Sequence, residues 1–411
     1  MTSASSETSP LPPRVIVDLS RTNQQGTVDT TDSGSSNRFA AQPEPVLDPG
    51  APLDDKHVMR EEIGRGGMGR VLKVRDVDLN RDVAMKILLA SSGNATRFIE
   101  EAQITGQLDH PNVLPVHDMG IGAQGELFFT MKLVRSHQSL KDLIQRLSDG
   151  DKAAHEELTF ERRVQIVQQL CEVLEYAHQR GVVHRDIKPE NVVLGSFGEI
   201  YLVDWGVAKL VEPKAPPGEL PAGEIVNVIG DLDREQTREG QILGTIPYMS
   251  PEQVMGRQEL VGPWSDLYSL CALLYEFLSL EHYLSGASQE TYIQTLSSIV
   301  HYVPIEAETW FSLQNGRVPR SLSHICRKGL AKKPGDRHAS AREIREELQY
   351  WIEGRSPIVC PGTLMQRGLS TYSHWIDRHP VVLPLISLFV GLFVLQAAAQ
   401  WVWQLIVAFT S

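Results

Sequence analysis

The stretch HRDIKPEN at residues 184–191 carries a carboxylate, an ammonium group and a carboxamide close together in the chain. A second stretch, VDWG at residues 203–206, adds another carboxylate at the end of an apolar run. In phosphoryl transfer, one carboxylate orients the attacking hydroxyl and accepts its proton, while a carboxylate and an amide oxygen hold Mg²⁺ against the triphosphate. The two stretches together therefore indicate phosphoryl-transfer chemistry.

A glycine-rich run lies upstream, where IGRGGMGRV at residues 63–71 reads as strand, turn and strand. Glycines allow backbone N–H groups to approach phosphates closely. A G-x-G-x-x-G run also occurs in dinucleotide-binding folds, but those require a helix that opens on the glycines. Residues 72–75 instead continue as a strand, and the strand after it, VAMK at residues 83–86, carries Lys86.

Residues 94–108 are predicted to form a helix with two adjacent glutamates, either of which could pair with Lys86. Successive helical residues point about 100° apart. With Glu101 directed toward Lys86, Glu100 is expected to face solvent. Further along, residues 158–180 and 264–280 also have helical spacing, and Ser265 or Asp266 is expected to cap the second of these helices.

With these motifs in this order, the sequence resembles the protein kinases, and within them the eukaryote-like serine/threonine kinases of bacteria. The resemblance covers residues 57–354. It implies an α+β, bilobal kinase fold, with a β-rich N-lobe, a helical C-lobe and ATP between them. The implied reaction is transfer of the ATP γ-phosphate to Ser or Thr hydroxyls of proteins, including autophosphorylation.

The resemblance also assigns roles to individual residues. Asp186 positions the hydroxyl and takes its proton, and Lys188 offsets phosphoryl charge. Asn191 and Asp204 hold Mg²⁺, with Mn²⁺ as an alternative. Lys86, fixed by Glu101, grips the α- and β-phosphates. The implied ATP-binding residues are Ile63, Gly64, Arg65, Gly66, Gly67, Met68, Gly69, Val71, Ala84, Lys86, Met131 as gatekeeper and Leu133 in the hinge.

Two positions depart from the family pattern. Lys132 stands in the hinge where an acidic residue is frequent, and Trp205 replaces the phenylalanine that follows the metal-binding aspartate. The hinge contacts ATP mainly through its backbone, and the aromatic residue packs without performing chemistry. Both changes are therefore expected to leave the assignment intact.

A long segment without clear periodicity, residues 207–243, leads to GTIPYMSPE at residues 244–252, which resembles the end of a kinase activation segment. The resemblance implies structural roles for Thr245, Glu252, Asp266 and Arg337. Thr245 should bond near Asp186 and Lys188, Arg337 should pair with Glu252, and Asp266 should steady the catalytic loop. Because an unpaired arginine is costly, phosphorylation between Val207 and Thr245, with Thr237 as the leading candidate, is predicted to supply a dianion to Arg185; a carboxylate of the acidic segment is the alternative.

Composition limits the other functions. The net charge of −12 argues against a nucleic-acid-binding surface. The four cysteines are far apart and form no C-x-x-C pair, so neither a zinc site nor a disulfide framework is suggested. Residues 1–56 are rich in Ser, Thr, Pro and Gly, and are predicted to be a disordered tail without the apolar core of a signal peptide.

The C-terminal part has a different composition. After His379 the chain contains no Asp, Glu, Lys or Arg up to Ser411. The length of this uncharged, largely apolar run exceeds the roughly 20 residues that a helix needs to cross a bilayer. Residues 355–379 are therefore predicted as a juxtamembrane linker and 380–411 as a single-pass transmembrane segment. The kinase would face the cytoplasm in membrane-anchored signalling. A buried core helix and a re-entrant hairpin are the alternatives.

Other functional classes stay open at this point. A pseudokinase, acting as a membrane-tethered binding module, would be favoured by loss of Lys86, Asp186 or Asp204, and all three are present. An aminoglycoside or lipid kinase fits poorly with residues 244–252 and Arg337, which suit protein-substrate kinases. The expected partners are ATP, proteins with Ser or Thr, and the bilayer. A homodimer is also compatible with the resemblance, whereas nucleic acid is not expected.

Overall fold

A computed structural model describes residues 53–66, 69–89, 95–135, 138–211, 246–285, 287, 292–304, 307, 311–312 and 315–355, together with Gln396, Gln400 and Trp403. Most of the tail predicted at 1–56, and all but three residues of 356–411, lie outside the described part. Among the described residues, no helix combines the length and the apolar character needed to cross a bilayer.

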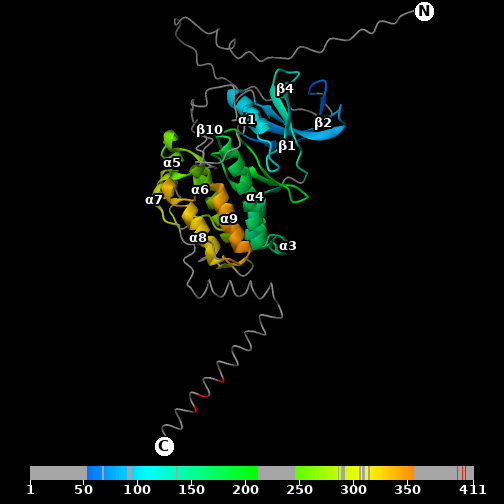
Figure 1. Ribbon diagram of the computed structural model, residues 1–411. Helices are drawn as coiled ribbons and strands as arrows, with labels where there is room; N and C mark the ends of the chain where they lie inside the picture. The colour runs from blue at the N-terminus through cyan, green and yellow to red at the C-terminus, as the bar shows by residue number, and fades with distance from the viewer. Residues whose placement is uncertain are drawn as a thin grey trace, which may run out of the picture. The chain divides into compact units, whose positions relative to one another are not determined.

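The N-lobe is built on a five-stranded antiparallel sheet with the order β1-β2-β3-β5-β4 (Figure 1). Burial alternates along β2, because successive strand residues point to opposite faces. Its inward residues Leu72 and Val74 pack with Val83, Met85 and Ile87 of β3. The strands are β1 (His57–Arg65), β2 (Gly69–Asp76), β3 (Arg81–Leu88), β4 (Val116–Ile121) and β5 (Leu127–Met131), and the lobe's helix is α1 (Ala95–Gln107).

The C-lobe is mainly helical. Its core surrounds α4 (Phe160–Gln179) and α6 (Pro263–Ser279), and α6 is buried along almost its whole length. The remaining helices are α2 (Leu140–Ser148), α3 (Lys152–Glu157), α5 (Pro251–Val254), α7 (Tyr292–His301), α8 (Arg320–Gly329) and α9 (Ala341–Ile352). The short 3₁₀ turns are η3 (Pro189–Asn191), η4 (Ile246–Tyr248), η5 (Gln258–Leu260) and η7 (Pro334–Asp336).

Short strands in the C-lobe hold the segment that contains the HRD stretch. The strand β7 (Val182–Val183) pairs with β10 (Lys209–Leu210), while β8 (Val192–Leu194) pairs antiparallel with β9 (Ile200–Leu202). The β8–β9 hairpin brings its two ends together, since the N–H of Val203 donates to the Asn191 carbonyl over 2.9 Å. Two further short strands pair elsewhere, β6 (Gln138–Ser139) with β8 and β11 (Phe311–Ser312) with β12 (Gly316–Arg317).

The expected cap of α6 is wrong. The helix begins at Pro263, and its N-cap is Gly262, whose N–H donates to the Ser265 hydroxyl over 3.2 Å. Proline suits the first helical position because the missing N–H has no partner there. Ser265 and Asp266 therefore lie inside the first turn, and Asp266 is left to bond with another part of the chain.

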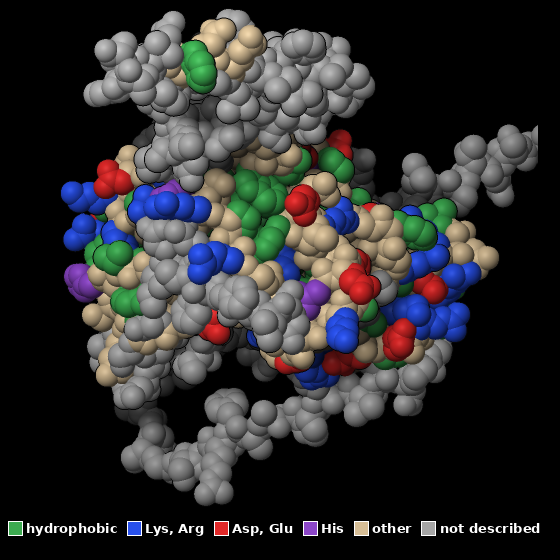
Figure 2. Space-filling model, turned by 90° about the horizontal axis from the view of Figure 1, so that it is seen from below, with side chains coloured by type: hydrophobic (Ala, Val, Ile, Leu, Met, Phe, Trp, Pro, Cys, Tyr) green, Lys and Arg blue, Asp and Glu red, His purple; other side chains and the backbone are tan. Residues whose placement is uncertain are grey.

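Acidic and basic side chains are interspersed over the face of the molecule shown in Figure 2, with hydrophobic side chains gathered near its centre. Several large hydrophobic side chains are exposed on the N-lobe, among them Leu79, Met119 and Ile121. Scattered exposed hydrophobics are ordinary on soluble surfaces.

Candidate active site

One buried carboxylate of the C-lobe holds the backbone of the HRD segment. Asp266, at the start of α6, is fully buried, and its two oxygens accept the N–H groups of His184 and Arg185, each over 2.8 Å. The same carboxylate contacts Nε2 of His178 over 2.7 Å. Asp266 thus holds two consecutive backbone groups next to Asp186, in the position that the resemblance implied for it.

Three polar side chains meet directly after this anchor. Lys188 Nζ lies 2.7 Å from Asp186 Oδ2, and the Asn191 amide donates to the same oxygen over 3.0 Å. The second oxygen, Asp186 Oδ1, is buried and has no hydrogen-bond partner among the described residues. A buried acceptor without a partner is costly. Asp186 therefore has one oxygen fixed by two side chains and one oxygen without a partner among the described residues.

Two non-glycine residues at the site adopt the left-handed backbone conformation. Arg185 has φ of 69° and Asp204 has φ of 66°. Such conformations cost about 1–3 kcal/mol each and persist where surrounding contacts enforce them. At Arg185 the contacts are visible, because its N–H bonds to Asp266 and its carbonyl accepts the Gln253 side-chain amide over 2.8 Å.

Lys86 joins the N-lobe helix to the second carboxylate. Its Nζ lies 2.5 Å from Glu101 Oε1 on α1 and 3.7 Å from Asp204 Oδ1. Burial alone would lower the pKa of Lys86, but the negative charges of Glu101 and Asp204 outweigh it and raise that pKa. Lys86 is therefore a fixed positive charge placed between two carboxylates.

The expectation for Glu100 is wrong. Its side chain is buried, with 6% of the residue exposed, and burial raises its pKa more than nearby Arg97 lowers it. The first turns of α1 are covered over a wide arc, since consecutive residues from Phe98 to Ala102 are all buried. Helical spacing alone therefore did not separate the two glutamates into a buried and an exposed one.

Trp205 is buried beside the HRD histidine. Its ring centroid lies 4.5 Å from that of His184 in an edge arrangement, and its Nε1–H donates to the Leu202 carbonyl over 3.3 Å. Burial lowers the pKa of His184, which accepts the Asp186 N–H at Nδ1 and contacts the Val203 carbonyl at Nε2. Trp205 thus fills the place of a phenylalanine and adds one hydrogen bond.

The glycine-rich run forms the turn between β1 and β2. The Gly66 N–H donates to the Gly69 carbonyl over 2.8 Å, and a Cβ at Gly69 would lie 2.5 Å from the Ile87 carbonyl oxygen. Only glycine fits position 69 without a backbone shift. Ile63, Gly64 and Arg65 lie on β1, Val71 and Ala84 lie on facing strands, and Gly67 and Met68 are outside the described residues.

An apolar cluster lies where the hinge begins. Leu114, Val134 and Tyr201 are buried together, with Met131, Val193 and Val203 packed against them. The sequence predicted Met131 and the hinge residue Leu133 at this place, but not Val193 and Tyr201. Their signal was weak, because each is one apolar residue on a short strand.

Lys132 has an unexpected partner. Its ammonium bonds to the Tyr201 hydroxyl, lies 4.9 Å from the centre of that ring and lies 3.9 Å from Glu199 Oε1. The hinge is thereby tied to β9, the strand that leads to Asp204. The lysine that departs from the family pattern therefore has a structural role outside the hinge backbone.

The implied pair of Glu252 and Arg337 is present. The guanidinium donates to both carboxylate oxygens, over 2.8 and 2.9 Å, and both side chains are buried. Arg185 donates to the Gln258 side chain over 3.0 Å. Thr237 and Thr245 lie outside the described residues.

Comparison with known proteins decides the family. The sequence-family model described as the protein kinase domain matches residues 57–349, which is more than half of the chain. The chain belongs to the protein kinase family. The serine/threonine-protein kinase PknD of Chlamydia trachomatis serovar L2b is 32% identical over 328 residues, covering 76% of this chain and 33% of that protein. PknD of Protochlamydia amoebophila is 29% identical over 324 residues, covering 77% and 32%.

Another similar protein is the serine/threonine-protein kinase PknB of Mycolicibacterium smegmatis, which is 30% identical and covers 74% of this chain and 44% of that protein. The chain thus spans about a third of the length of the PknD relatives it matches. Among solved structures, the kinase domain of Mycobacterium tuberculosis PknI aligns with a TM-score of 0.50 and 22% identity over 75% of this chain and all of that chain. This likeness supports the bilobal kinase fold.

The donor set of the kinase site fits a hard divalent cation. Asp204 presents a half-exposed carboxylate, and Asn191 donates through its amide nitrogen to Asp186, which leaves its amide oxygen available. Carboxylate and amide oxygens are the ligands that Mg²⁺ prefers. The residues assigned to the metal from the sequence are therefore chemically suited to it.

Gly206 offers a test of the Lys86–Glu101 pair. A Cβ at this position would lie 3.0 Å from Glu101 Oε2 and 3.3 Å from Asp204 Oδ1. Gly206→Ala is expected to lower kcat/KM for ATP about 10-fold, because the added methyl displaces the Glu101 and Asp204 carboxylates, and small misplacements of catalytic groups slow a reaction strongly. Gly335→Ala, where an added Cβ meets open space, is the matched control. Equal kinetics for the two variants would contradict the prediction.

Proposed function

We propose that this protein is a serine/threonine protein kinase that transfers the γ-phosphate of ATP to hydroxyl groups of proteins. The observation that carries the proposal is a pair of polar clusters whose chain segments are joined by the hydrogen bond from the Val203 N–H to the Asn191 carbonyl. Lys86 of the N-lobe pairs with Glu101 and reaches Asp204, while Asp186, Lys188 and Asn191 converge in the C-lobe. The names of the PknD and PknB relatives support serine/threonine specificity.

In the proposed mechanism Asp186 accepts the proton of the attacking hydroxyl at Oδ1, the buried oxygen without a partner among the described residues. Its other oxygen is held by Lys188 and Asn191, so the carboxylate has a fixed orientation. A positioned base of this kind contributes about 10²–10⁴-fold to the rate. Lys188, 2.7 Å from Asp186, is placed to offset charge on the transferred phosphoryl group.

Lys86 holds the phosphates of ATP from the N-lobe side, and its pair with Glu101 fixes the position of its charge. Asn191 and Asp204 would hold Mg²⁺, which, when bound, neutralises negative charge on the triphosphate. The adenine ring would lie against the apolar cluster of Met131, Val134 and Val193. The chain supplies orientation and electrostatic stabilisation in this scheme and forms no covalent bond to the phosphate.

The direct test is incubation of the purified full-length protein with γ-labelled ATP and Mg²⁺, first alone and then with a mixture of Ser-, Thr- and Tyr-containing peptides. Label on the protein itself and on Ser or Thr peptides is the expected result. Label confined to Tyr peptides, to small molecules or to nothing would contradict the proposal. Mapping of the labelled sites would also show whether Thr237 is modified.

We further propose that residues 380–411 anchor the kinase in the cytoplasmic membrane, with the kinase domain on the cytoplasmic side. The support comes from the sequence. The run contains no Asp, Glu, Lys or Arg, and it begins directly after Arg378 and His379. Positive residues favour the cytoplasmic flank of a span. Trp401 and Trp403 are suited to an interfacial position.

Truncation after Arg355 tests the anchor. Full-length protein is expected to stay in the membrane fraction through high-salt and carbonate washes, because burial of about 20 apolar residues makes insertion effectively irreversible. The truncated protein is expected to be soluble and active, since the catalytic residues lie upstream. Full-length protein that washes off would refute the anchor. A truncated protein that is soluble but unfolded would assign the C-terminal segment to the kinase core.

A further inference from the structure

Two side chains, Lys132 and Tyr201, join the hinge to β9. The Lys132 ammonium donates to the Tyr201 hydroxyl and lies 4.9 Å from the centre of its ring. Tyr201 is 3% exposed, whereas 41% of the Lys132 side chain is exposed. The buried tyrosine therefore provides a fixed point on β9, and the lysine reaches it from the hinge.

A carboxylate next to β9 helps to hold the lysine in this place. Glu199 Oε1 lies 3.9 Å from Lys132 Nζ. The Phe197 N–H donates to Glu199 Oε2 over 2.9 Å and lowers the pKa of that carboxyl group, so Glu199 is negative at neutral pH. The ammonium is thus attracted by the face and the hydroxyl of a tyrosine and by a negative charge on the turn before β9.

The backbone links the hinge to β9 by a second route. The Lys132 N–H donates to the Pro115 carbonyl over 3.0 Å, and the Leu202 N–H donates to the Asn112 carbonyl over 2.9 Å. The short segment that carries these two carbonyls is therefore bonded to the hinge on one side and to β9 on the other. The contact between the lysine and tyrosine side chains closes this arrangement into a ring of three chain segments.

In the proposed mechanism, the hinge and β9 serve opposite ends of ATP. The adenine ring would lie against the cluster that contains Met131 and Val193, and Val193 pairs with Tyr201 across the β8–β9 hairpin. β9 leads to Asp204, whose Oδ1 lies 3.7 Å from Lys86 Nζ at the phosphate end. A ligand that contacts two sites at once gains most when their separation matches its own length.

We infer that Lys132 and Tyr201 are positioning residues for ATP, which fix the separation between the adenine site at the hinge and the phosphate site at Asp204. The inference rests on the proposed kinase function. It gives a role in ATP binding to the lysine that stands where an acidic residue is frequent. Loss of the contact should weaken a ligand that reaches both sites, and should leave a ligand of the adenine site alone almost unchanged.

The test compares two ligands by isothermal titration calorimetry on the full-length protein. Adenosine reaches only the adenine site. Adenylyl imidodiphosphate with Mg²⁺ is an ATP analogue that spans both sites and whose terminal phosphate is not transferred. In Lys132→Met the Kd of the analogue should rise about fivefold, while the Kd of adenosine should change by less than about twofold.

Three further variants separate positioning from a general loss of stability. Lys132→Arg keeps a cation over the ring and should retain both wild-type Kd values. Tyr201→Phe keeps the ring but removes the hydroxyl, so the Kd of the analogue should rise by less than in Lys132→Met. The double variant Lys132→Met/Tyr201→Phe should bind the analogue as Lys132→Met does, because both substitutions remove the same contact.

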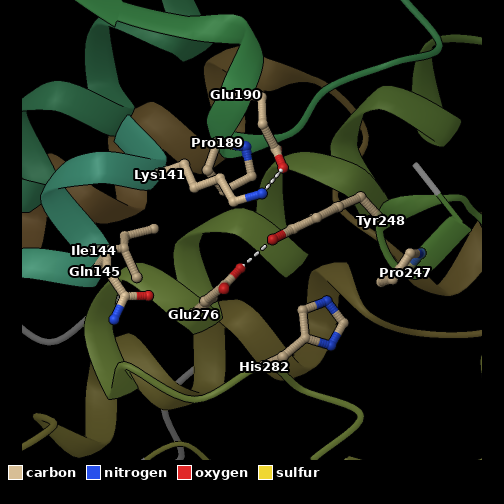
Figure 3. Close-up of a pocket in the computed structure, with 9 residues that line it drawn as sticks. All are labelled: Lys141, Ile144, Gln145, Pro189, Glu190, Pro247, Tyr248, Glu276 and His282. Atoms are coloured by element: carbon tan, nitrogen blue, oxygen red, sulfur yellow. Dashed lines mark hydrogen bonds and ion pairs between the residues drawn. The ribbon is translucent and has the colours of Figure 1, made fainter. Parts of the chain in front are cut away.

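Lys141→Met is the matched control. Lys141 also pairs with a carboxylate of another chain segment, but within the C-lobe, where its Nζ lies 2.7 Å from Glu190 Oε1. Figure 3 shows this pair in a cavity lined by residues of α2, η3, η4 and α6. The substitution makes the same chemical change as Lys132→Met and should alter neither Kd.

Two results would overturn the inference. One is a Kd of the analogue in Lys132→Met equal to that in Lys141→Met. The other is an equal weakening of adenosine and the analogue in Lys132→Met, since Lys132 would then act on the adenine site itself. Failure of the proposed function looks different, because the wild type would then bind neither ligand, and the inference would fall with it.

Discussion

Replacing Asp186 by Asn is expected to lower kcat by about 10²–10⁴-fold, the contribution of a positioned general base. Asparagine has nearly the same shape and can keep contacts with Lys188 and Asn191, but it cannot take the proton at Oδ1. The fold should survive, because the anchor of the catalytic loop is Asp266, which is unchanged. The loss should therefore appear in kcat at nearly constant KM for ATP.

The measurement is steady-state transfer of labelled phosphate, with thermal unfolding recorded for each variant. Asp109→Asn is the matched control, because Asp109 is an exposed aspartate on the loop after α1 and the chemical change is identical. Turnover of Asp186→Asn within a few-fold of the Asp109→Asn protein would exclude Asp186 as the base.

Arg337→Leu is expected to reduce the free energy of unfolding by about 3–5 kcal/mol, the range for breaking one side of a buried ion pair. All of the guanidinium's donor groups are used, since it bonds to both oxygens of Glu252 and to the carbonyls of Ala331, Lys332 and Trp264. Leucine would fill much of the volume, but among the described residues it would leave the buried Glu252 carboxylate with the Ser265 hydroxyl as its one side-chain donor.

Denaturant unfolding measures this loss, and Arg342→Leu serves as the comparison. Arg342 pairs with Glu346 on the exposed face of α9, and exposed pairs of this kind contribute about 0–1 kcal/mol. The double variant Glu252→Gln/Arg337→Leu should recover part of the stability, because it removes the stranded charge. Equal losses for Arg337→Leu and Arg342→Leu would show that the buried pair is dispensable.

The sequence by itself determined the fold class and predicted the cluster of Asp186, Lys188 and Asn191. Asp186, Lys188 and Asn191 lie so near one another in the chain that connectivity keeps them together, since each residue spans at most about 3.6 Å. The glycine-rich turn and the strand with Lys86 have local patterns of their own. Helical spacing of apolar residues placed α4 and α6 close to their observed limits, because a helix that packs on a core must bury apolar side chains at that spacing.

Only the tertiary structure decided which polar groups meet across the fold. The burial of Glu100, the contact of Lys132 with Tyr201 and the pairing of Lys141 with Glu190 join segments that no local pattern connects. Likewise, Asp266 does not cap α6, because the helix begins at Pro263, and its carboxylate instead bonds to the HRD backbone, which is far away in the sequence. A side chain's partner depends on which surfaces pack together, and packing is a property of the whole domain.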